Sequence, residues 1–202
     1  MKSHRFIVLF IAAFLCILGC TPSYIYAPRP TTYVKQCLTC KEVPQTLMIL
    51  PFESPSYFLD GGVFTAKLFY QRLLEQDEFE HIYYSQNPDW FEKGMTWHGR
   101  TELAIEEGRR AGVDYILIGS IDYYLVGHIT TNRVTVTARL IEVMSGETMY
   151  FATGYGSGKP GKTFLLLDAK PGGFTPSPTA VLSVVVNNMV RDYFRRGWFS
   201  FI

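Results

Sequence analysis

The sequence has little cysteine and almost no net charge. Only four of its 202 residues are cysteines, and 19 lysines and arginines are balanced by 18 aspartates and glutamates. A chain so close to neutral lacks the basic surface that nucleic-acid binding needs, so we expect no nucleic-acid partner. Aromatic residues, by contrast, are frequent, with thirteen Tyr, fifteen Phe and three Trp. Such side chains suit interfaces, where one end of the ring is buried and the other is wet.

The apolar run near the N-terminus is too short to cross a membrane. It covers residues 6–18, whereas a spanning helix needs about 20 apolar residues. Basic residues precede the run and Gly19 and Cys20 follow it, which is typical of a secretory signal. The Gly-Cys ending resembles the bacterial lipobox, in which the cysteine thiol is acylated and the segment before it is removed. We therefore predict a lipoprotein signal peptide over residues 1–19 and lipidation of Cys20, with an ordinary cleaved signal or an uncleaved anchor as alternatives.

A lipid anchor at Cys20 would fix where the rest of the chain works. Acyl chains contribute about 0.8 kcal/mol per buried CH₂, so several of them hold a protein on a membrane almost permanently. Thr21 follows the cysteine, and no aspartate stands there to signal retention at the inner membrane. In a Gram-negative cell, the expected location is therefore the periplasmic face of the outer membrane.

Two further cysteines, Cys37 and Cys40, form a C-x-x-C pair. In an oxidising periplasm a local disulfide is the first interpretation. A thioredoxin-like redox site needs such a pair between a strand and a helix, which the surrounding sequence does not predict. A zinc site needs about four ligands, and the chain has no second cysteine pair. We expect no metal and no cofactor.

The remainder of the chain divides into a tether, one domain and a short tail. Residues 20–45 are rich in proline and tyrosine. This favours a semi-rigid spacer that holds the domain off the membrane or lies along a neighbouring subunit. Residues 46–196 are enough for one domain with a full core. Residues 197–202 form an aromatic tail.

Hydrophobic periodicity predicts five strands and three helices in the domain. The expected strands cover residues 46–52, 80–85, 114–126, 133–143 and 147–155, and the expected helices cover residues 63–76, 101–111 and 178–194. In the fourth strand, Val134, Val136, Ala138 and Leu140 alternate with polar residues, which indicates a half-buried antiparallel strand. The order β-α-β-α-β-β-β-α predicts an α/β layered sandwich with an antiparallel meander and helices packed on the sheet. Residues 156–176 are expected to form a loop.

Residues 156–163, GSGKPGKT, match the phosphate-binding pattern G-x-x-x-x-G-K-T. That loop needs a buried parallel strand before it and a helix after it whose N-terminus faces the phosphates. Here an antiparallel meander precedes the match and only a short segment follows it. We therefore favour a flexible glycine-lysine loop over a nucleotide site. Lys159 and Lys162 would then be available to touch lipid head groups or an anionic polymer.

No catalytic set stands out in the sequence. Glu53 is a lone carboxylate after the first strand. His98 and Glu102 would make an acid/base pair, but a solvated helix start explains them more simply. No serine lies in a G-x-S-x-G motif. We expect a protein that is not an enzyme.

The end of the last helix combines arginine with aromatic residues. Arg195 and Arg196 are followed by Trp198 and Phe199. This composition is typical of a contact with a membrane interface or with a partner. In the alternative interpretation, the aromatic residues fold back onto the sheet.

Three stretches of the domain stand out together, namely residues 47–52 (LMILPF), 111–121 (AGVDYILIGSI) and 134–147, which end in LIEVMSGE. They resemble a family of bacterial envelope lipoproteins that includes CsgG, PelC and LpoB. The resemblance covers about residues 46–194. It implies an anticodon-binding-domain-like α/β fold, in proteins that often assemble into rings at the outer membrane. These motifs are structural, so they bear on the fold more than on the activity.

These features lead to one leading hypothesis and one alternative. The leading hypothesis is a non-enzymatic lipoprotein, anchored in the outer membrane, that helps to assemble or export an envelope polymer such as an exopolysaccharide or a secreted fibre. It would act with envelope export proteins, as a homo-oligomeric ring. The alternative is a lipoprotein that activates a peptidoglycan synthase and so works with cell-wall proteins.

Overall fold

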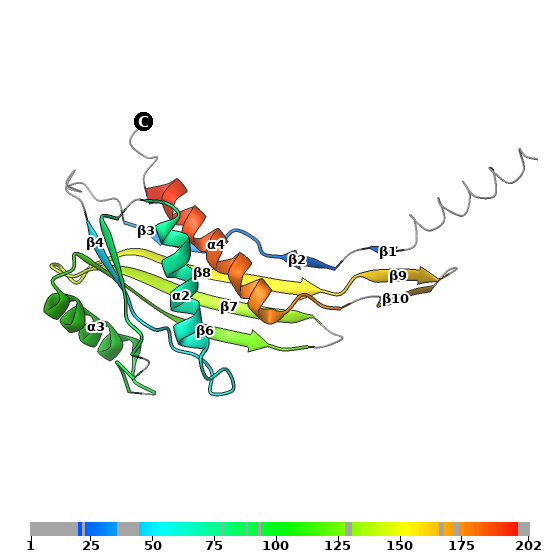
Figure 1. Cartoon of the computed structure of the whole chain (residues 1–202), viewed down its shortest axis with the longest axis horizontal. Helices are drawn as coiled ribbons and strands as arrows, with labels where there is room; N and C mark the ends of the chain where they lie inside the picture. Colours follow the sequence, from blue (N-terminus) through cyan, green and yellow to red (C-terminus); the bar gives the residue numbers. More distant parts are fainter. Residues whose placement is uncertain are drawn as a thin grey trace, which may run out of the picture.

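One long curved sheet carries helices on both of its faces (Figure 1). The structure is a computed structural model, and it describes residues 20–21, 23–35, 45–77, 79–87, 89–92, 94–127, 131–165, 168–171 and 174–197. The helices are α2 (Gly61–Leu74), α3 (Trp97–Ala111) and α4 (Pro178–Gly197). The strands are β1 (Cys20–Thr21), β2 (Tyr24–Tyr26), β3 (Thr31–Val34), β4 (Thr46–Ile49), β5 (His81–Tyr84), β6 (Tyr115–Leu125), β7 (Asn132–Glu142), β8 (Thr148–Lys159), β9 (Lys162–Leu165) and β10 (Asp168–Pro171).

The main sheet joins a parallel part to an antiparallel part. Its strand order is β2-β8-β7-β6-β4-β5, and β3 also pairs with β8. Strand β4 lies parallel to both β5 and β6, whereas β6, β7 and β8 form an antiparallel meander. The predicted order β4-α2-β5-α3-β6-β7-β8 is found along the chain, and the additional strands β9 and β10 precede α4, so the mixed α/β class is confirmed.

The helix ends follow from capping residues. Helix α3 begins at Trp97, four residues earlier than expected, because the Thr96 hydroxyl accepts a hydrogen bond from the Gly99 amide at 3.3 Å and caps the first turn. It ends at Gly112, whose φ of 69° allows the left-handed cap that glycine favours. In α4, the Ser177 hydroxyl accepts from the Ala180 amide at 3.1 Å, as expected for an N-cap. In the described part of the chain, the structure has no helix with the length and apolar character needed to cross a membrane.

The main core lies between one face of the sheet and the helices α2 and α4. The inward residues predicted for β7 are all buried there. They meet the buried face of α4, which carries Val181, Leu182, Val185 and Met189. The helix lies very close to β8, since a Cβ added at Gly154 would approach the Met189 sulfur and the Val185 side chain to 2.7 Å. Glycine on this strand therefore lets α4 come down onto the sheet.

A smaller core lies on the opposite face, under α3. It consists of buried residues from that helix and from neighbouring strands and loops, namely Leu50, Ala104, Val113, Ile116, Ile118, Ile141 and Val143. Helix α3 packs mainly on β6. In the described part of the chain, no helix covers this face at the ends of β7 and β8 that lie farthest from α3.

The segment expected to be a spacer is partly built into the sheet. Strands β2 and β3 both pair antiparallel with β8 of the same chain. An unpaired strand edge invites aggregation, and these strands cover the edge that the meander leaves open. Pro28 and Pro30 lie in the connection between β2 and β3, where no ladder hydrogen bond needs their missing N–H.

The segment expected to be a loop is also mostly strand. Strand β8 continues through Lys159, and β9 and β10 then form a hairpin. Strand β1 pairs with β9, so the backbone of Cys20 lies opposite that of Thr163. The expectation of a loop over residues 156–176 was wrong for these strands, because their repeated glycine and lysine hid the strand pattern.

Candidate interaction surfaces

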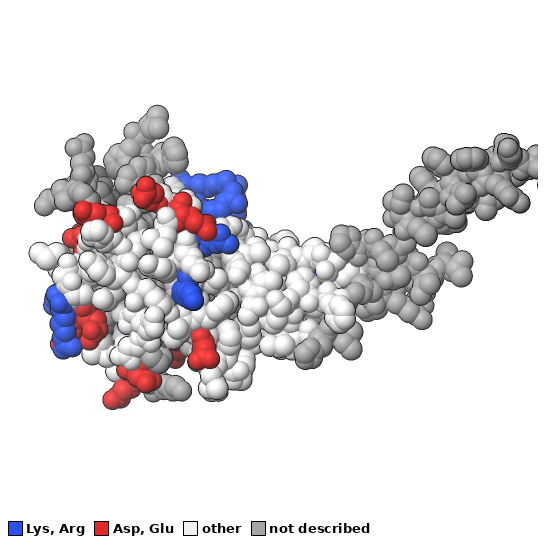
Figure 2. All heavy atoms as spheres, viewed as in Figure 1, with Lys and Arg blue, Asp and Glu red and all other residues white. Residues whose placement is uncertain are grey.

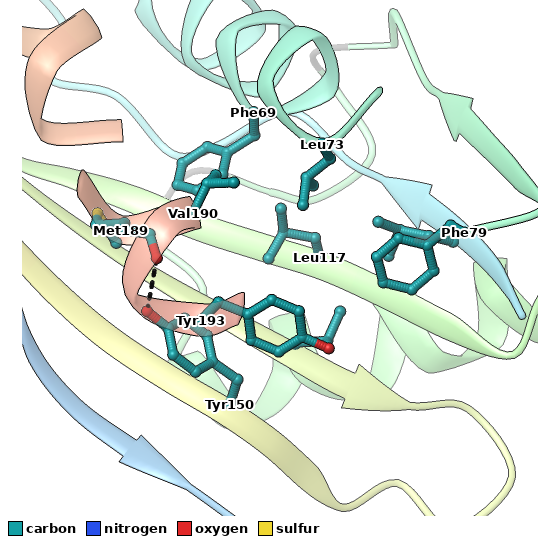
Figure 3. Close-up of a pocket in the computed structure, with 10 residues that line it drawn as sticks. Phe69, Leu73, Phe79, Leu117, Tyr150, Met189, Val190 and Tyr193 are labelled. Atoms are coloured by element: carbon teal, nitrogen blue, oxygen red, sulfur yellow. Dashed lines mark hydrogen bonds between the residues drawn. The ribbon is translucent and has the colours of Figure 1, made fainter. Parts of the chain in front are cut away.

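A small apolar cavity lies between α2, α4 and the sheet (Figure 3). Its volume is about 20 Å³, and Phe69, Leu73 and Leu117 are among its lining residues. The Tyr150 hydroxyl points toward α4 and donates a hydrogen bond to the Met189 carbonyl at 3.1 Å. A cavity of this size has room for about one water molecule. Small-molecule sites have volumes of roughly 300 Å³ or more, so this cavity is a packing gap rather than a ligand site.

Glu53, which looked like a lone carboxylate in the sequence, has an ionic partner. Its carboxylate pairs with the guanidinium of Arg100, which is buried. That guanidinium also lies 4.4 Å from the centroid of the Trp97 ring and 5.5 Å from that of Phe91. These contacts fix the first turns of α3 against the loop after β4, which gives Glu53 a structural role.

Arg139 on β7 lies beside the same group. Its guanidinium donates to the hydroxyls of Thr148 at 2.6 Å and Thr101 at 3.3 Å. It also lies 5.9 Å from the centroid of the Trp97 ring. Burial lowers the pKa of Arg139 from its usual value, because the charged form is poorly solvated there. The pair of His98 and Glu102, at 3.1 Å, is mostly exposed, as expected of a solvated helix start.

An uncovered aromatic surface lies on the α3 face of the sheet, beyond the reach of α3. Phe151 on β8 is paired with Arg139 on β7 and with Tyr33 on β3. Arg139 in turn contacts α3 through a hydrogen bond to Thr101. Since directly paired residues point to the same side of a sheet, these side chains share that face. The strand register places further exposed aromatic and apolar side chains of β2, β6 and β8 on this same face. We call this surface the tyrosine face, and its members are Tyr26, Tyr33, Tyr123, Leu125, Phe151 and Tyr155.

The tyrosine face combines exposed aromatic side chains with a few charged ones, since Arg133 and Arg139 lie on the same side of the sheet. The side chains of its named members are 37% to 58% exposed. Asp122, within this surface, accepts hydrogen bonds from the hydroxyls of Ser120 and Thr137. Exposed aromatic surface of this kind is a candidate interaction site.

A second candidate surface is a hollow of about 320 Å³ between α4 and the connection from β2 to β3. Figure 2 shows basic side chains gathered near the C-terminal end of α4. We call this site the arginine hollow, and its lining residues are Ala27, Arg29, Pro30, Asn188, Arg191, Asp192 and Arg195. It brings together Arg29 and Arg195, which lie 166 positions apart in the sequence. No local pattern indicated this pairing, because residues 20–45 were expected to form a spacer that holds the domain off the membrane or lies along a neighbouring subunit.

The residues singled out from the sequence have different positions in the structure. Cys20 lies in β1, where the structure describes its backbone. Arg195 lines the arginine hollow, and the backbone of Arg196 continues α4. Cys37, Cys40, Trp198 and Phe199 lie outside the described residues. Within the described part of the chain, no three histidine, cysteine or acidic side chains gather as metal ligands would.

The match to the phosphate-binding pattern does not form a phosphate-binding loop. Its first residues belong to β8, which is antiparallel to β7, and Lys162 and Thr163 begin β9. A strand therefore stands where the phosphate loop requires a helix N-terminus. The preference against a nucleotide site is supported, although these residues are strands rather than a flexible loop.

Solved structures of other proteins are similar to this one. One is the PelC dodecamer from Paraburkholderia phytofirmans, with a TM-score of 0.50, 14% identity and coverage of 83% of this chain and 95% of that chain. Another is the lipoprotein GNA1162 from Neisseria meningitidis, with a TM-score of 0.44, 14% identity and coverage of 75% of this chain and 99% of that chain. A third is the LpoB C-terminal domain from Escherichia coli, with a TM-score of 0.36, 14% identity and coverage of 58% of this chain and 87% of that chain. The resemblance expected from the sequence is thus confirmed at the level of the fold. No protein-family model and no curated protein matches the sequence.

Proposed function

We propose that this chain is a non-enzymatic lipoprotein, anchored in the outer membrane through Cys20, that helps to assemble or export an envelope polymer. In this proposal it acts as a homo-oligomeric ring, in which the tyrosine face of each copy packs against a neighbouring copy. The core would be an anticodon-binding-domain-like sandwich to which strands from residues 20–45 have been added.

The tyrosine face is the observation that carries this proposal. It is an uncovered sheet surface rich in aromatic side chains, which are the side chains enriched at protein interfaces. The PelC structure with which this chain shares its fold is a dodecamer, and this supports a second copy of the chain as the partner. A lipid anchor would also concentrate copies on one membrane, which favours association through a moderate interface.

In this proposal, the position of Cys20 would set the orientation of the ring on the membrane. Strand β1 lies at one end of the long axis, with β9 and β10, while the C-terminal end of α4 lies toward the other end (Figure 1). Lipid on Cys20 would place the β9-β10 hairpin near the membrane, with Lys162 in reach of lipid head groups. Arg195 and Arg196, with Trp198 and Phe199 after them, would then contact a periplasmic partner rather than this membrane. A disulfide between Cys37 and Cys40 would form a small local ring within the segment of the chain that follows β3.

The anchor is tested by labelling the full chain with an alkyne-tagged palmitate in a Gram-negative host. We expect label and outer-membrane fractionation for the wild type and loss of both for Cys20→Ala. Cys37→Ala is the matched control and should keep both. An unlabelled wild type would refute the anchor.

The partner is tested by cross-linking the membrane-bound protein in cells and identifying what is captured. We expect copies of the chain itself together with an export protein of the envelope. Capture of a peptidoglycan synthase, without self-association, would favour the activator role instead.

A further inference from the structure

We propose that the arginine hollow binds an oxyanion, that is, a phosphate or carboxylate group carried by a ligand that is not embedded in the anchoring membrane. This inference goes beyond the proposed ring, because it depends on the hollow of a single chain.

One side of the hollow is a stripe along α4. Asn188, Arg191, Asp192 and Arg195 follow one another at spacings of three, one and three residues. Residues three and four apart lie on the same face of a helix. The two arginines of this stripe are therefore held next to each other by the helix itself.

The other side of the hollow is the connection between β2 and β3. The Asn188 side-chain amide donates a hydrogen bond to the Ala27 carbonyl at 3.1 Å and so fixes this connection against α4. The rings of Pro28 and Pro30 restrict the backbone on both sides of Arg29. Pairing of β2 and β3 with β8 holds both ends of the connection. Arg29 is thus placed by the backbone beside the α4 stripe before any ligand arrives.

The charge of the hollow favours an anion. Three arginines and one aspartate line it, which gives a formal charge of +2. Among the described residues, none of the ion pairs involves Arg29, Arg191 or Arg195. Other arginines of the chain, such as Arg72, Arg100 and Arg110, do have carboxylate partners. Arginines that line one hollow repel one another, and a bound anion would relieve that repulsion.

The size and chemistry of the hollow define the ligand group. A volume of about 320 Å³ is at the lower end of the range for small-molecule sites. It suits one charged sugar or phosphate-ester unit. Guanidinium groups form paired hydrogen bonds with carboxylate and phosphate, so three of them suit an oxyanion with several acceptor oxygens.

The C-terminal half of α4, which lines the hollow, lies away from β1 and the backbone of Cys20 (Figure 1). A bilayer that holds a lipid on Cys20 is therefore poorly placed to supply the ligand. A soluble anion, or a charged unit of a periplasmic chain, is better placed to reach the three arginines.

The test is calorimetric titration of the full lipidated chain in uncharged detergent with glucuronate and, separately, with inorganic pyrophosphate. We expect at least one to bind, and we expect Arg29→Ala and Arg191→Ala each to weaken that binding tenfold or more. Arg191→Lys keeps the positive charge but loses the paired hydrogen bonds that a guanidinium forms, so this variant should bind with intermediate affinity. Raising the salt to 0.5 M should weaken binding in the wild type.

The matched control is Arg109→Ala, which removes an exposed arginine on α3, a helix that lies on the opposite face of the sheet from α4. This variant should bind as the wild type does. Failure of both probes to bind, or an equal loss in Arg109→Ala, would overturn the proposal. Addition of phosphatidylglycerol to the detergent separates the sources of the oxyanion. No competition is expected, and competition would mean that the hollow serves a lipid head group.

Discussion

The two faces of the main sheet are built from the same strands and have opposite chemistry. On the face under α2 and α4, strand β7 presents a row of fully buried apolar side chains. On the other face the same strand presents Arg133, Thr135, Thr137 and Arg139, and its neighbours add exposed aromatic side chains. Helix α3 covers only part of that second face.

This difference separates stability from interaction. Burial of apolar side chains is the main favourable contribution to folding, and here it is concentrated on the covered face. The open face is not needed to complete the core, so its aromatic side chains are available to a partner. Substitutions on the two faces should therefore affect different measurements.

The largest loss of stability is expected on the covered face. Leu182 on α4 is fully buried in the main core. Replacing it with alanine should lower the free energy of unfolding by about 2–5 kcal/mol, because apolar contacts are lost and a cavity is left. Urea unfolding followed by circular dichroism measures this change. A loss below 1 kcal/mol would mean that α4 is not packed as described.

An intermediate loss is expected where α3 meets the open face. Glu53→Ala leaves the buried guanidinium of Arg100 without its carboxylate, which should cost about 1–3 kcal/mol. The control is Glu102→Ala, whose partner His98 is exposed, and it should cost less than about 0.5 kcal/mol. Equal effects of the two substitutions in urea unfolding would contradict a structural role for the Glu53 pair.

A smaller, pH-dependent effect should come from tyrosines on the covered face. Burial, with a further contribution from Glu142 and Asp114, raises the pKa of Tyr115 above its usual value. The folded protein therefore favours the neutral phenol. The stabilisation that this provides is complete below about pH 10, the unfolded value, and is lost as the pH rises through the folded value. In urea unfolding between pH 8 and 11, Tyr115→Phe should flatten the alkaline loss of stability. Burial also raises the pKa of Tyr84 and Tyr124, so some loss should remain.

The smallest effect on stability is expected on the open face. Tyr155 faces Thr135 across the strand pair and is exposed. Tyr155→Lys should lower the free energy of unfolding by less than about 1 kcal/mol, the size of one cross-strand pair. A loss as large as that of Leu182→Ala in the same unfolding experiment would erase the distinction between the two faces.

Periodicity in the sequence predicted the covered face correctly. The alternation of Val134 to Leu140 and the apolar stripe of Val181, Leu182, Val185 and Met189 depend on local spacing alone. These are the residues that the structure buries between β7 and α4. Local patterns of this kind are visible in a sequence because each element has its own period.

The candidate surfaces were not predictable in the same way. The tyrosine face needs β2 and β3 to pair with β8, and the arginine hollow needs Arg29 to lie beside Arg191. Both depend on contacts between residues more than 100 positions apart, and no local period records such contacts. Proline-rich composition indicated a spacer, because proline disfavours strands in general, although here it occupies the connection between two strands.

The most direct test of the proposed ring is the oligomeric state of the lipidated full chain in detergent, measured by native mass spectrometry. We expect the wild type to form complexes of several copies and Tyr155→Lys to be mainly monomeric. Tyr57→Lys, which makes the same change at an exposed position before α2, is the matched control and should assemble like the wild type. A wild type that stays monomeric, or a Tyr155→Lys variant that assembles as well as the wild type, would contradict the role given to the tyrosine face.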